Sequence, residues 1–399
     1  MKIKLRTLKF RHLRLTKVLI LQISILAALA ATSTAAIVFW NKENQVGMTL
    51  SAAKRDLDKS NNELGVLKSE DQYVKNKNLE EEINNIVKNY KVGVDQYEEI
   101  LRLRENKTDT KKLDEMFAQS LLFLSKRNYA SAGAVLKDLQ AEIERVNETN
   151  KTTALAEIPK NAPFNNSPPQ SGYSRQTVEA DAGKFMVDII SADLNSTRVI
   201  VDTAGNETCS TDCPVDSLAA YAGRNGAFAG VNGPYFCPAE YPTCADRKNS
   251  FDTLLMNKNK VYFNSDNNVY SSVPAVIFSG SGARFVGQSL EWGRDTGADS
   301  VIAAQPMLLS GGNIAFGGDG DPKKGSRGNR SFIGTNGSSV YIGVVHNATV
   351  SEVAHVLKAM GIQNALNLDS GGSTALWYQG KYIAGPGRNT PFGILLVSK

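Results

Sequence analysis

A run of 23 residues without a charge, Val18 to Trp40, constrains this chain more than any other feature of its sequence. Because the hydrocarbon core of a bilayer needs about 20 apolar residues in a helix, this run is long enough to span a membrane. The first 17 residues contain seven Lys or Arg residues and no acid. Basic residues on this side predict a cytoplasmic N-terminus, with the rest of the chain outside the membrane.

A cleaved signal peptide is the alternative reading of the same run. Small residues between Ala28 and Ala36 offer A-x-A-like cleavage sites. The length of the run and its bulky end, Ile37 to Trp40, favour an uncleaved signal anchor. The sequence therefore predicts a single-pass membrane protein, with a basic cytoplasmic segment at 1–17 and a transmembrane helix at 18–40.

The net charge of +5 does not indicate a nucleic-acid partner. The basic residues of segment 1–17 account for it, and the remainder of the chain is close to neutral. A nucleic-acid-binding protein carries a basic patch on its folded domain, whereas a basic block before an apolar run sets membrane topology.

The four cysteines form two close pairs in the sequence, Cys209 with Cys213 and Cys237 with Cys244. Four cysteines allow three connectivities, and pairing within each segment is the first expectation. A zinc site would favour C-x2-C spacing and additional ligands, but the chain has only three histidines. Two disulfides are therefore predicted, and they indicate an oxidising compartment and an extracellular or periplasmic C-terminal domain.

The region from 41 to 150 has a helical pattern. Residues 41–107 are predicted to form a coiled-coil stalk. A seam with alternating spacings of four and three, flawed only at Gly93, contains Leu79, Ile83, Ile86, Tyr90, Gly93, Tyr97 and Ile100, and a weaker seam in a different register lies upstream. Two readings stay open: a homo-oligomer through the coiled coil, and a solvated stalk that spaces the next domain from the membrane. Residues 108–150 are predicted to form a helical hairpin, and the Pro-, Asn- and Ser-rich stretch 151–175 a linker.

From residue 176 to 399 the pattern changes to short β-branched runs separated by glycines. Two helical patterns interrupt them, at 214–225 and 349–361. Thr349 and Glu352 have the spacing of a capping box, and Gly361 ends the second helix. The predicted class is α+β: a transmembrane helix and a helical stalk, followed by a mixed, strand-rich domain.

Asp369 is the strongest candidate for chemistry. It ends the apolar run "ALNL" and is followed by Ser370, Gly371, Gly372 and Ser373. Glycines let a ligand approach the backbone, whose N–H groups can bind an anion. An acid that caps a tight turn is the alternative. Asn232 and Gly233 likewise end an apolar run, and an ordinary Asn-Gly turn competes with a site there.

Arg330 lies in the glycine-rich segment Lys323–Thr335, directly before a predicted strand. A guanidinium on a rigid strand suits two-point binding of phosphate. The sequence contains no G-x-S-x-G elbow, no phosphate-binding P-loop and no H-E-x-x-H motif, which argues against the corresponding enzyme classes.

Several motifs in order resemble the phosphodiester glycosidase family over about residues 176–399. They are "GVNGPYF", "NRSFIG", the helix "VSEVAHVLKAMG" running into "NALNLDSGGST", and the terminal "RNTPFGILLV", which Arg388 opens. The family usually has glycine where Pro234 and Ser370 stand here. The resemblance implies hydrolysis of a sugar-1-phosphodiester, with Asp369, Arg330 and Asn232 as catalytic residues. The substrate-binding residues it implies are Gly233, Ser370, Gly371, Gly372, Ser373 and Arg388.

The implied substrate is a carbohydrate phosphodiester, such as an envelope glycan or glycolipid of a bacterial cell. No cofactor is predicted, and Asp369 with nearby carbonyls leaves a divalent cation open. A non-catalytic glycan-binding or scaffolding protein is the alternative function. Such a protein would use Asn232 and aromatic residues such as Tyr235, Trp377 and Tyr378, and would not need Asp369.

Overall fold

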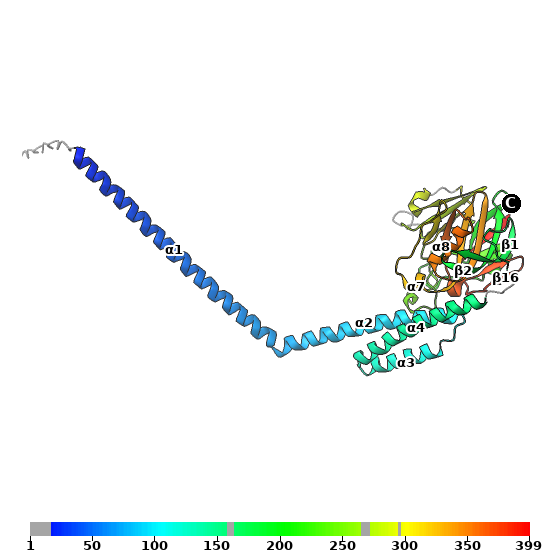
Figure 1. Cartoon of the computed structure of the whole chain (residues 1–399), viewed down its shortest axis with the longest axis horizontal. Coiled ribbons are helices and arrows are strands. Elements are labelled where there is room, and N and C mark those ends of the chain that lie inside the picture. Colours follow the sequence, from blue (N-terminus) through cyan, green and yellow to red (C-terminus); the bar gives the residue numbers. More distant parts are fainter. Residues whose placement is uncertain (1–16, 158–162, 265–271, 294–296) are drawn as a thin grey trace, which may run out of the picture. The chain divides into compact units, whose positions relative to one another are not determined.

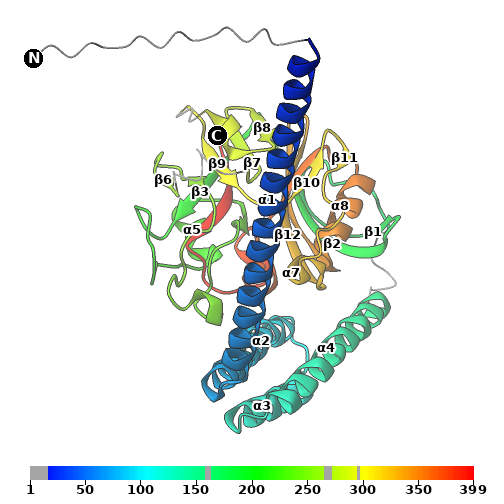
Figure 2. The same ribbon diagram turned by 90° about the vertical axis from the view of Figure 1, so that its left-hand side faces the viewer.

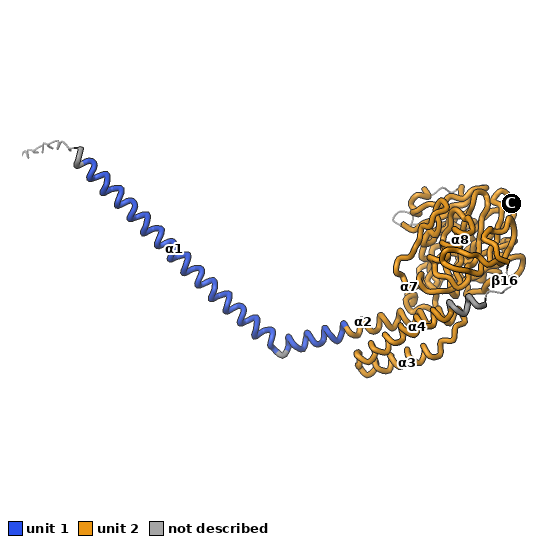
Figure 3. The backbone as a smooth tube through the Cα atoms, in the orientation of Figure 1, with its two compact units in different colours: residues 1–84 blue, residues 85–399 orange. Residues whose placement is uncertain are grey.

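The computed structural model describes residues 17–157, 163–264, 272–293 and 297–399, so segment 1–16 and part of the predicted linker lie outside the described residues. The chain forms two compact units, residues 1–84 and 85–399, and the division falls within one helix (Figure 3). The first unit is helical, and the second combines helices with three β-sheets (Figure 1). The predicted α+β class is thereby confirmed.

Four helices precede the sheets: α1 Lys17–Ser69, α2 Asp71–Glu105, α3 Lys111–Ser125 and α4 Tyr129–Glu157. Among the described residues, α1 is the one helix with a stretch long and apolar enough to cross a membrane. By the same criteria it fits a signal sequence. Leu79, Ile83 and Tyr90 of the predicted coiled-coil seam are exposed on α2, and the coiled coil stays a prediction.

The end of α2 packs with α3 and α4 into a small bundle that has its own apolar core (Figure 2). The fully or nearly fully buried members are Ile100, Leu103, Leu113, Leu136, Leu139 and Ile143. The buried positions of α4 are three to four residues apart, as expected for one face of a helix. This bundle belongs to the second unit together with the sheets.

A seven-stranded antiparallel sheet has the order β1-β2-β13-β12-β14-β10-β11. Its strands are β1 Gly172–Ala180, β2 Gly183–Asp193, β10 Met307–Ser310, β11 Asn313–Ile314, β12 Gly328–Asn336, β13 Ser339–Ala348 and β14 Asn364–Asn367. Helix α8, Val350–Ala359, packs on one face through an apolar stripe. The Thr349–Glu352 capping box forms as expected, because each side chain accepts a hydrogen bond from the other residue's backbone N–H.

Two five-stranded antiparallel sheets complete the domain. One has the order β16-β15-β4-β17-β3 and the other β6-β5-β9-β7-β8. Their strands are β3 Thr197–Thr203, β4 Ala229–Asn232, β5 Leu255–Met256, β6 Tyr262–Phe263, β7 Ala275–Ser279, β8 Gly282–Val286, β9 Ser300–Ala303, β15 Leu376–Tyr378, β16 Lys381–Ala384 and β17 Phe392–Ser398. Helix α5, Leu218–Arg224, covers the first of them.

One apolar core joins all three sheets. It contains Ile342 of β13, Ile394 of β17 and Ile302 of β9, each completely buried. Short helices occur in the loops: η1 Pro242–Cys244, η2 Ser289–Trp292, α7 Pro322–Gly325 and η3 Gly371–Ser373. Strand β14 lies between β12 and β10 in the seven-stranded sheet. Pairing on both sides fixes the point at which the following loop begins.

Candidate active site

The loop after β14 places Asp369 where strands of two sheets meet. The Leu368 N–H donates to the carbonyl of Ser331 on β12 at 3.0 Å, and the Asp369 N–H donates to the carbonyl of Gly233 at 3.1 Å. Helix η3 then turns the chain, with Gly371 at a positive φ of 64° that suits glycine. The backbone around the carboxylate is therefore fixed on both sides.

Asn232 lies beneath this loop, 1% exposed. Its Nδ2 donates to the Asp369 carbonyl at 2.7 Å. Its Oδ1 accepts from the Ser331 hydroxyl at 2.7 Å and from the Ala375 N–H at 3.1 Å. Both ends of the amide thus have protein partners, so the structure supports a positioning role for Asn232 at the Asp369 loop. A direct contact with substrate stays a prediction.

Gly233 is required sterically, because a Cβ at this position would overlap the ring of Phe392. Phe392 begins β17 and is 1% exposed, so the ring has little room to move. The residue therefore lets the β4 end approach β17 while its carbonyl accepts the Asp369 N–H.

A cavity of about 290 Å³ opens over Asp369. Seven of the described side chains that line it are cationic, and three are carboxylic acids. The cationic residues are Arg102, Arg247, Lys323, Lys324, Arg327, Arg330 and Arg388, and the acids are Asp252, Asp321 and Asp369. Within the part of the chain that the structure describes, all of these cations except Arg330 have an acidic ion-pair partner, so the lining is rich in cationic groups that an anionic ligand could contact only in competition with a carboxylate.

Asp369 is 8% exposed, and burial raises its pKa to about 6. The Ser373 hydroxyl, Arg388 and the Ser370 N–H oppose this rise. The N–H of Ser370 donates to Oδ1 at 2.8 Å, whereas Oδ2 is buried without a hydrogen-bond partner of acceptable geometry among the described residues. A buried, unpaired carboxylate oxygen is unusual outside sites where a ligand completes the contacts.

Arg330 also lines the cavity, but its guanidinium has backbone partners. Nε donates to the Ala348 carbonyl at 3.1 Å, and Nη2 donates to the carbonyls of Lys323 and Ser326. Arg330 is 6% exposed and supports the loop that carries Lys323. Its predicted contact with phosphate is not tested by this geometry and stays a prediction.

Arg388 lies directly beside the Asp369 loop, since its N–H donates to the Gly372 carbonyl at 2.7 Å. Ser370, Gly371 and Ser373 line the cavity with Arg388. The structure thus brings together Asp369, Arg330, Arg388 and most of the predicted loop, with Asn232 and Gly233 below them.

The sequence reasoning missed two groups at this site, Glu105 and Tyr241. Glu105 ends α2 in the helical bundle, and its Oε2 accepts from the Gly372 N–H at 2.8 Å. Its Oε1 forms an ion pair with Arg388, and the Tyr241 hydroxyl lies 3.3 Å from Oε2. No local motif marks Glu105, one acid among many in a charged helical segment. Tyr241 could have been suspected, because it lies between two predicted disulfide partners.

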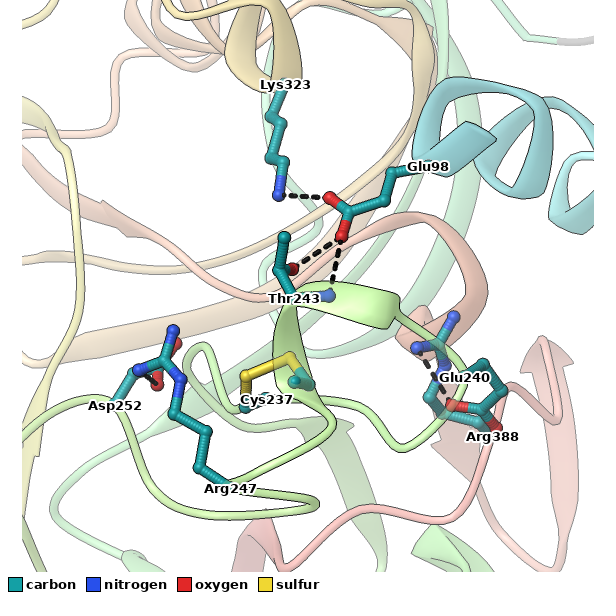
Figure 4. Close-up of a disulfide and its surroundings, with 9 residues drawn as sticks. Glu98, Cys237, Glu240, Thr243, Arg247, Asp252, Lys323 and Arg388 are labelled. Carbon is teal, nitrogen blue, oxygen red and sulfur yellow. Dashed lines mark hydrogen bonds and ion pairs between the residues drawn. A yellow bond between two sulfur atoms is a disulfide. The ribbon is translucent and has the colours of Figure 1, made fainter. Parts of the chain in front are cut away.

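The Cys237–Cys244 disulfide closes the loop that carries Tyr241 (Figure 4). Both cysteines line the cavity, as does Thr243 of the same loop. Figure 4 also shows Glu240 turned toward Arg388, at 3.5 Å. The second disulfide joins Cys209 to Cys213, so both predicted local pairings are confirmed. The disulfides are consistent with an extracellular domain.

Replacing both Cys237 and Cys244 by serine should lower the free energy of unfolding by about 2 kcal/mol, the loop-closure entropy of so short a crosslink. The loop that carries Tyr241 should also exchange its amide hydrogens faster, because its closure is lost. Hydrogen exchange of residues 238–245 measures this directly. The matched control replaces Cys209 and Cys213, which are absent from the described cavity lining and should leave that loop unchanged.

Among the described residues, no group of three or more His, Cys, Asp or Glu side chains is arranged to hold a metal ion. Asp252 is the second acid of interest in the cavity, because burial raises the pKa of its carboxyl group while Arg247, 3.5 Å away, opposes the rise. The arrangement therefore offers a buried carboxylate, backbone N–H groups and guanidinium groups around one anion-sized space.

Residues 225–397 match the family model described as phosphodiester glycosidase. The resemblance seen in the motifs is confirmed by this match. A search of curated proteins finds no significant match.

Several solved structures overlap with parts of the chain, and three of them are the following. One is the catalytic domain of zebrafish N-acetylglucosamine-1-phosphodiester alpha-N-acetylglucosaminidase, auto-inhibited by its pro-peptide, at 14% identity and a TM-score of 0.44, covering 60% of this chain and 87% of that one. A hypothetical protein from Synechocystis has 11% identity and a TM-score of 0.41, with 57% of this chain and 62% of that one covered. A putative exported protein from Burkholderia pseudomallei has 12% identity and a TM-score of 0.34, with coverages of 54% and 74%. The similarity to the family rests on the match of residues 225–397 to its model rather than on these partial overlaps.

Proposed function

We propose that this protein is a membrane-anchored hydrolase that cleaves sugar-1-phosphodiester bonds in envelope glycans or glycolipids outside the membrane. The family match supports a glycosidase that acts at phosphodiesters. The apolar stretch of α1 supports an anchor with a cytoplasmic N-terminus, given the basic residues before it. The two disulfides support the extracytoplasmic position of the sheet domain.

One observation carries the proposed chemistry: Asp369, whose buried Oδ2 has no hydrogen-bond partner among the described residues, lines a cavity together with seven cationic side chains. A carboxylate in this setting can act on the anomeric carbon of a sugar while the cations hold the phosphate. Arg330, Arg388 and the N–H groups of Gly371 and Gly372 are the proposed phosphate contacts.

In the proposed reaction, the bond between the anomeric carbon and the phosphate oxygen breaks, and its electron pair leaves with the phosphate. The product phosphomonoester needs charge stabilisation more than a proton, so the guanidinium groups carry most of that role. Asp369 either removes a proton from a water that attacks the anomeric carbon, or attacks that carbon itself and forms a glycosyl ester. In the second route a water then hydrolyses the ester, which releases the sugar and restores the carboxylate. Both roles require the ionised carboxylate, and the released products are a free sugar and a phosphomonoester.

The position of the aromatic residues argues against a purely glycan-binding role. Tyr235 lines the cavity, and its hydroxyl accepts a hydrogen bond from Asn367 at 2.8 Å. Trp377 packs against the core beneath α5, and Tyr378 packs against the central core and the Tyr173 ring. Trp377 and Tyr378 are thus absent from the described cavity lining, and the aromatic residues found there are Tyr235, Phe236 and Tyr241. Two of the three aromatic residues expected of a glycan-binding protein do not reach the site, whereas the buried carboxylate does.

The catalytic rate should rise with pH through about 6 and level off above 7. Because the pKa of Asp369 is raised to about 6, roughly one tenth of the molecules hold the ionised form at pH 5. The value of kcat/KM should therefore be roughly tenfold lower at pH 5 than at pH 7.5. A rate that falls over this range would indicate that the protonated acid is the active form.

The direct test uses the full chain in detergent and without reductant, with a GlcNAc-1-phosphodiester as substrate. Released free sugar is measured against time, with UDP-GlcNAc as a second substrate. Sugar release by the wild type supports the proposal. If no sugar is released while the protein still binds glycans, the result supports a non-catalytic glycan-binding protein instead.

A further inference from the structure

The carboxylate of Glu105 has the partners that a bound anion would need. Oε2 accepts from the Gly372 N–H at 2.8 Å, Oε1 forms an ion pair with Arg388, and the Tyr241 hydroxyl lies 3.3 and 3.5 Å from the two oxygens. The Glu105 side chain is 19% exposed and that of Arg388 is 12% exposed. A backbone N–H, a guanidinium and a phenol form a set of donors typical of phosphate sites.

These donors cannot serve Glu105 and a substrate phosphate at once. Gly372 leaves so little space that a Cβ would overlap both Glu105 and the Arg388 guanidinium. Asp369 lies close enough for the charge of Glu105 to raise the pKa of its carboxyl group, and Arg388 lowers the same pKa. Glu105 therefore lies on the reactive side of the loop, within reach of the proposed chemistry.

The helix that carries Glu105 is attached to the sheet domain by polar contacts. Glu98, about two helical turns earlier on α2, accepts from the Thr243 N–H at 3.2 Å and from Lys323 Nζ at 2.9 Å (Figure 4). On α4, the carbonyl of Asn150 accepts from Asn347 Nδ2 at 2.9 Å.

The apolar core of the bundle is separate from the cores of the sheets. Elements with their own core and polar attachments can move apart without exposing much apolar surface. Separation of the bundle from the cavity would therefore leave each apolar core intact.

We infer that Arg388, the Gly372 N–H and Tyr241 form the subsite for the phosphate of the substrate, and that Glu105 fills this subsite from within the chain. The inference rests on the proposed function for the identity of the natural ligand. In this arrangement, a phosphate competes with the chain's own carboxylate, and its apparent affinity is reduced by the fraction of molecules in which Glu105 has left. The helical bundle thus holds the enzyme in a latent state.

Glu105→Gln should release the latent state, because the neutral amide keeps the shape but loses the attraction to Arg388. The probe is inorganic phosphate, titrated calorimetrically into the full chain. Its Kd should fall at least tenfold in the Glu105→Gln variant, and further in Glu105→Ala. Glu115→Gln is the matched control, since Glu115 is exposed on α3 and the same charge change there should leave phosphate binding unaltered.

Adding Arg388→Ala to Glu105→Gln should abolish the gained phosphate affinity. Circular dichroism and thermal unfolding show whether each variant is folded. If Glu105→Gln does not fold, Glu105→Ala takes its place in the phosphate titration. Equal phosphate affinity in the wild type and both Glu105 variants would overturn the inference. So would a gain that persists after Arg388 is removed.

The hydrolysis assay separates this inference from the proposed function. If the enzyme reading is right, Glu105→Gln should lower KM for the phosphodiester at least tenfold. It should also move the rise of kcat/KM to lower pH, because a charge that raises the pKa of Asp369 is gone. If no variant releases sugar but phosphate binding changes as expected, the proposed reaction fails and the subsite stands.

Discussion

Asp369→Asn should reduce kcat for sugar release by at least about 10³-fold, because the amide can neither attack the anomeric carbon nor accept a proton from water. The KM should change little, since the phosphate contacts proposed for Arg388 and Gly372 remain. Steady-state kinetics of the full-length variant at pH 7.5 measure both values. Residual activity near that of the wild type would remove Asp369 from the mechanism.

The same variant carries its own folding control. The pKa of Asp369 is about 6 in the folded state and 3.8 for an ordinary aspartic acid in the unfolded chain. The protonated group therefore contributes stability that is fully present below pH 3.8 and is lost as the pH rises through 6. At pH 8 the buried ionised carboxylate therefore lowers the free energy of unfolding by on the order of 1–3 kcal/mol. An asparagine at this position carries no charge and avoids this loss. Urea unfolding at pH 8 should find Asp369→Asn at least as stable as the wild type.

Gly233→Ala should lower the free energy of unfolding by about 3 kcal/mol, because the new Cβ overlaps the buried Phe392 ring. The substitution adds one methyl group and no charge, so the loss reflects packing alone. Since the Gly233 carbonyl accepts the Asp369 N–H, activity should fall as well. Thermal and urea unfolding of the variant measure the loss of stability.

A double-mutant cycle tests the reason for that loss. Phe392→Leu removes the ring that a Cβ at position 233 would meet. By itself it should lower the free energy of unfolding by about 1–2 kcal/mol. The double variant should then be more stable than the sum of the two single losses predicts. Strict additivity would show that the Phe392 contact is not the cause.

Local sequence patterns were enough to predict the parts of the fold that depend on neighbouring residues. The Thr349–Glu352 capping box, the break of α8 before Gly361 and both disulfide pairings follow from spacings of a few residues. The loop after β14 was predicted in the same way, from an acid followed by two glycines. Tertiary context adds little to such features, so they transfer from sequence to structure.

Contacts between distant segments could not be predicted in this way. Glu105 meets Gly372 across 267 positions of the chain, and nothing in the sequence near Glu105 distinguishes it from other acids of the helical region. Arg330 shows the converse limit. It was predicted to lie directly before a strand, but it lies within β12. Its guanidinium donates to the carbonyls of Ala348 at the end of β13 and of Lys323 in α7.

The side chain of Asn232 ties the catalytic loop to the strands around it, and this has a consequence for how the protein tolerates mutation. One amide contacts the Asp369 carbonyl, the Ser331 hydroxyl on β12 and the Ala375 N–H next to β15. A substitution that shifts either strand by a fraction of an ångström also shifts the carboxylate, even when the core absorbs the change. Neutral drift should therefore concentrate on the sheet β6-β5-β9-β7-β8, which contributes none of these partners, while β12 and β15 change slowly.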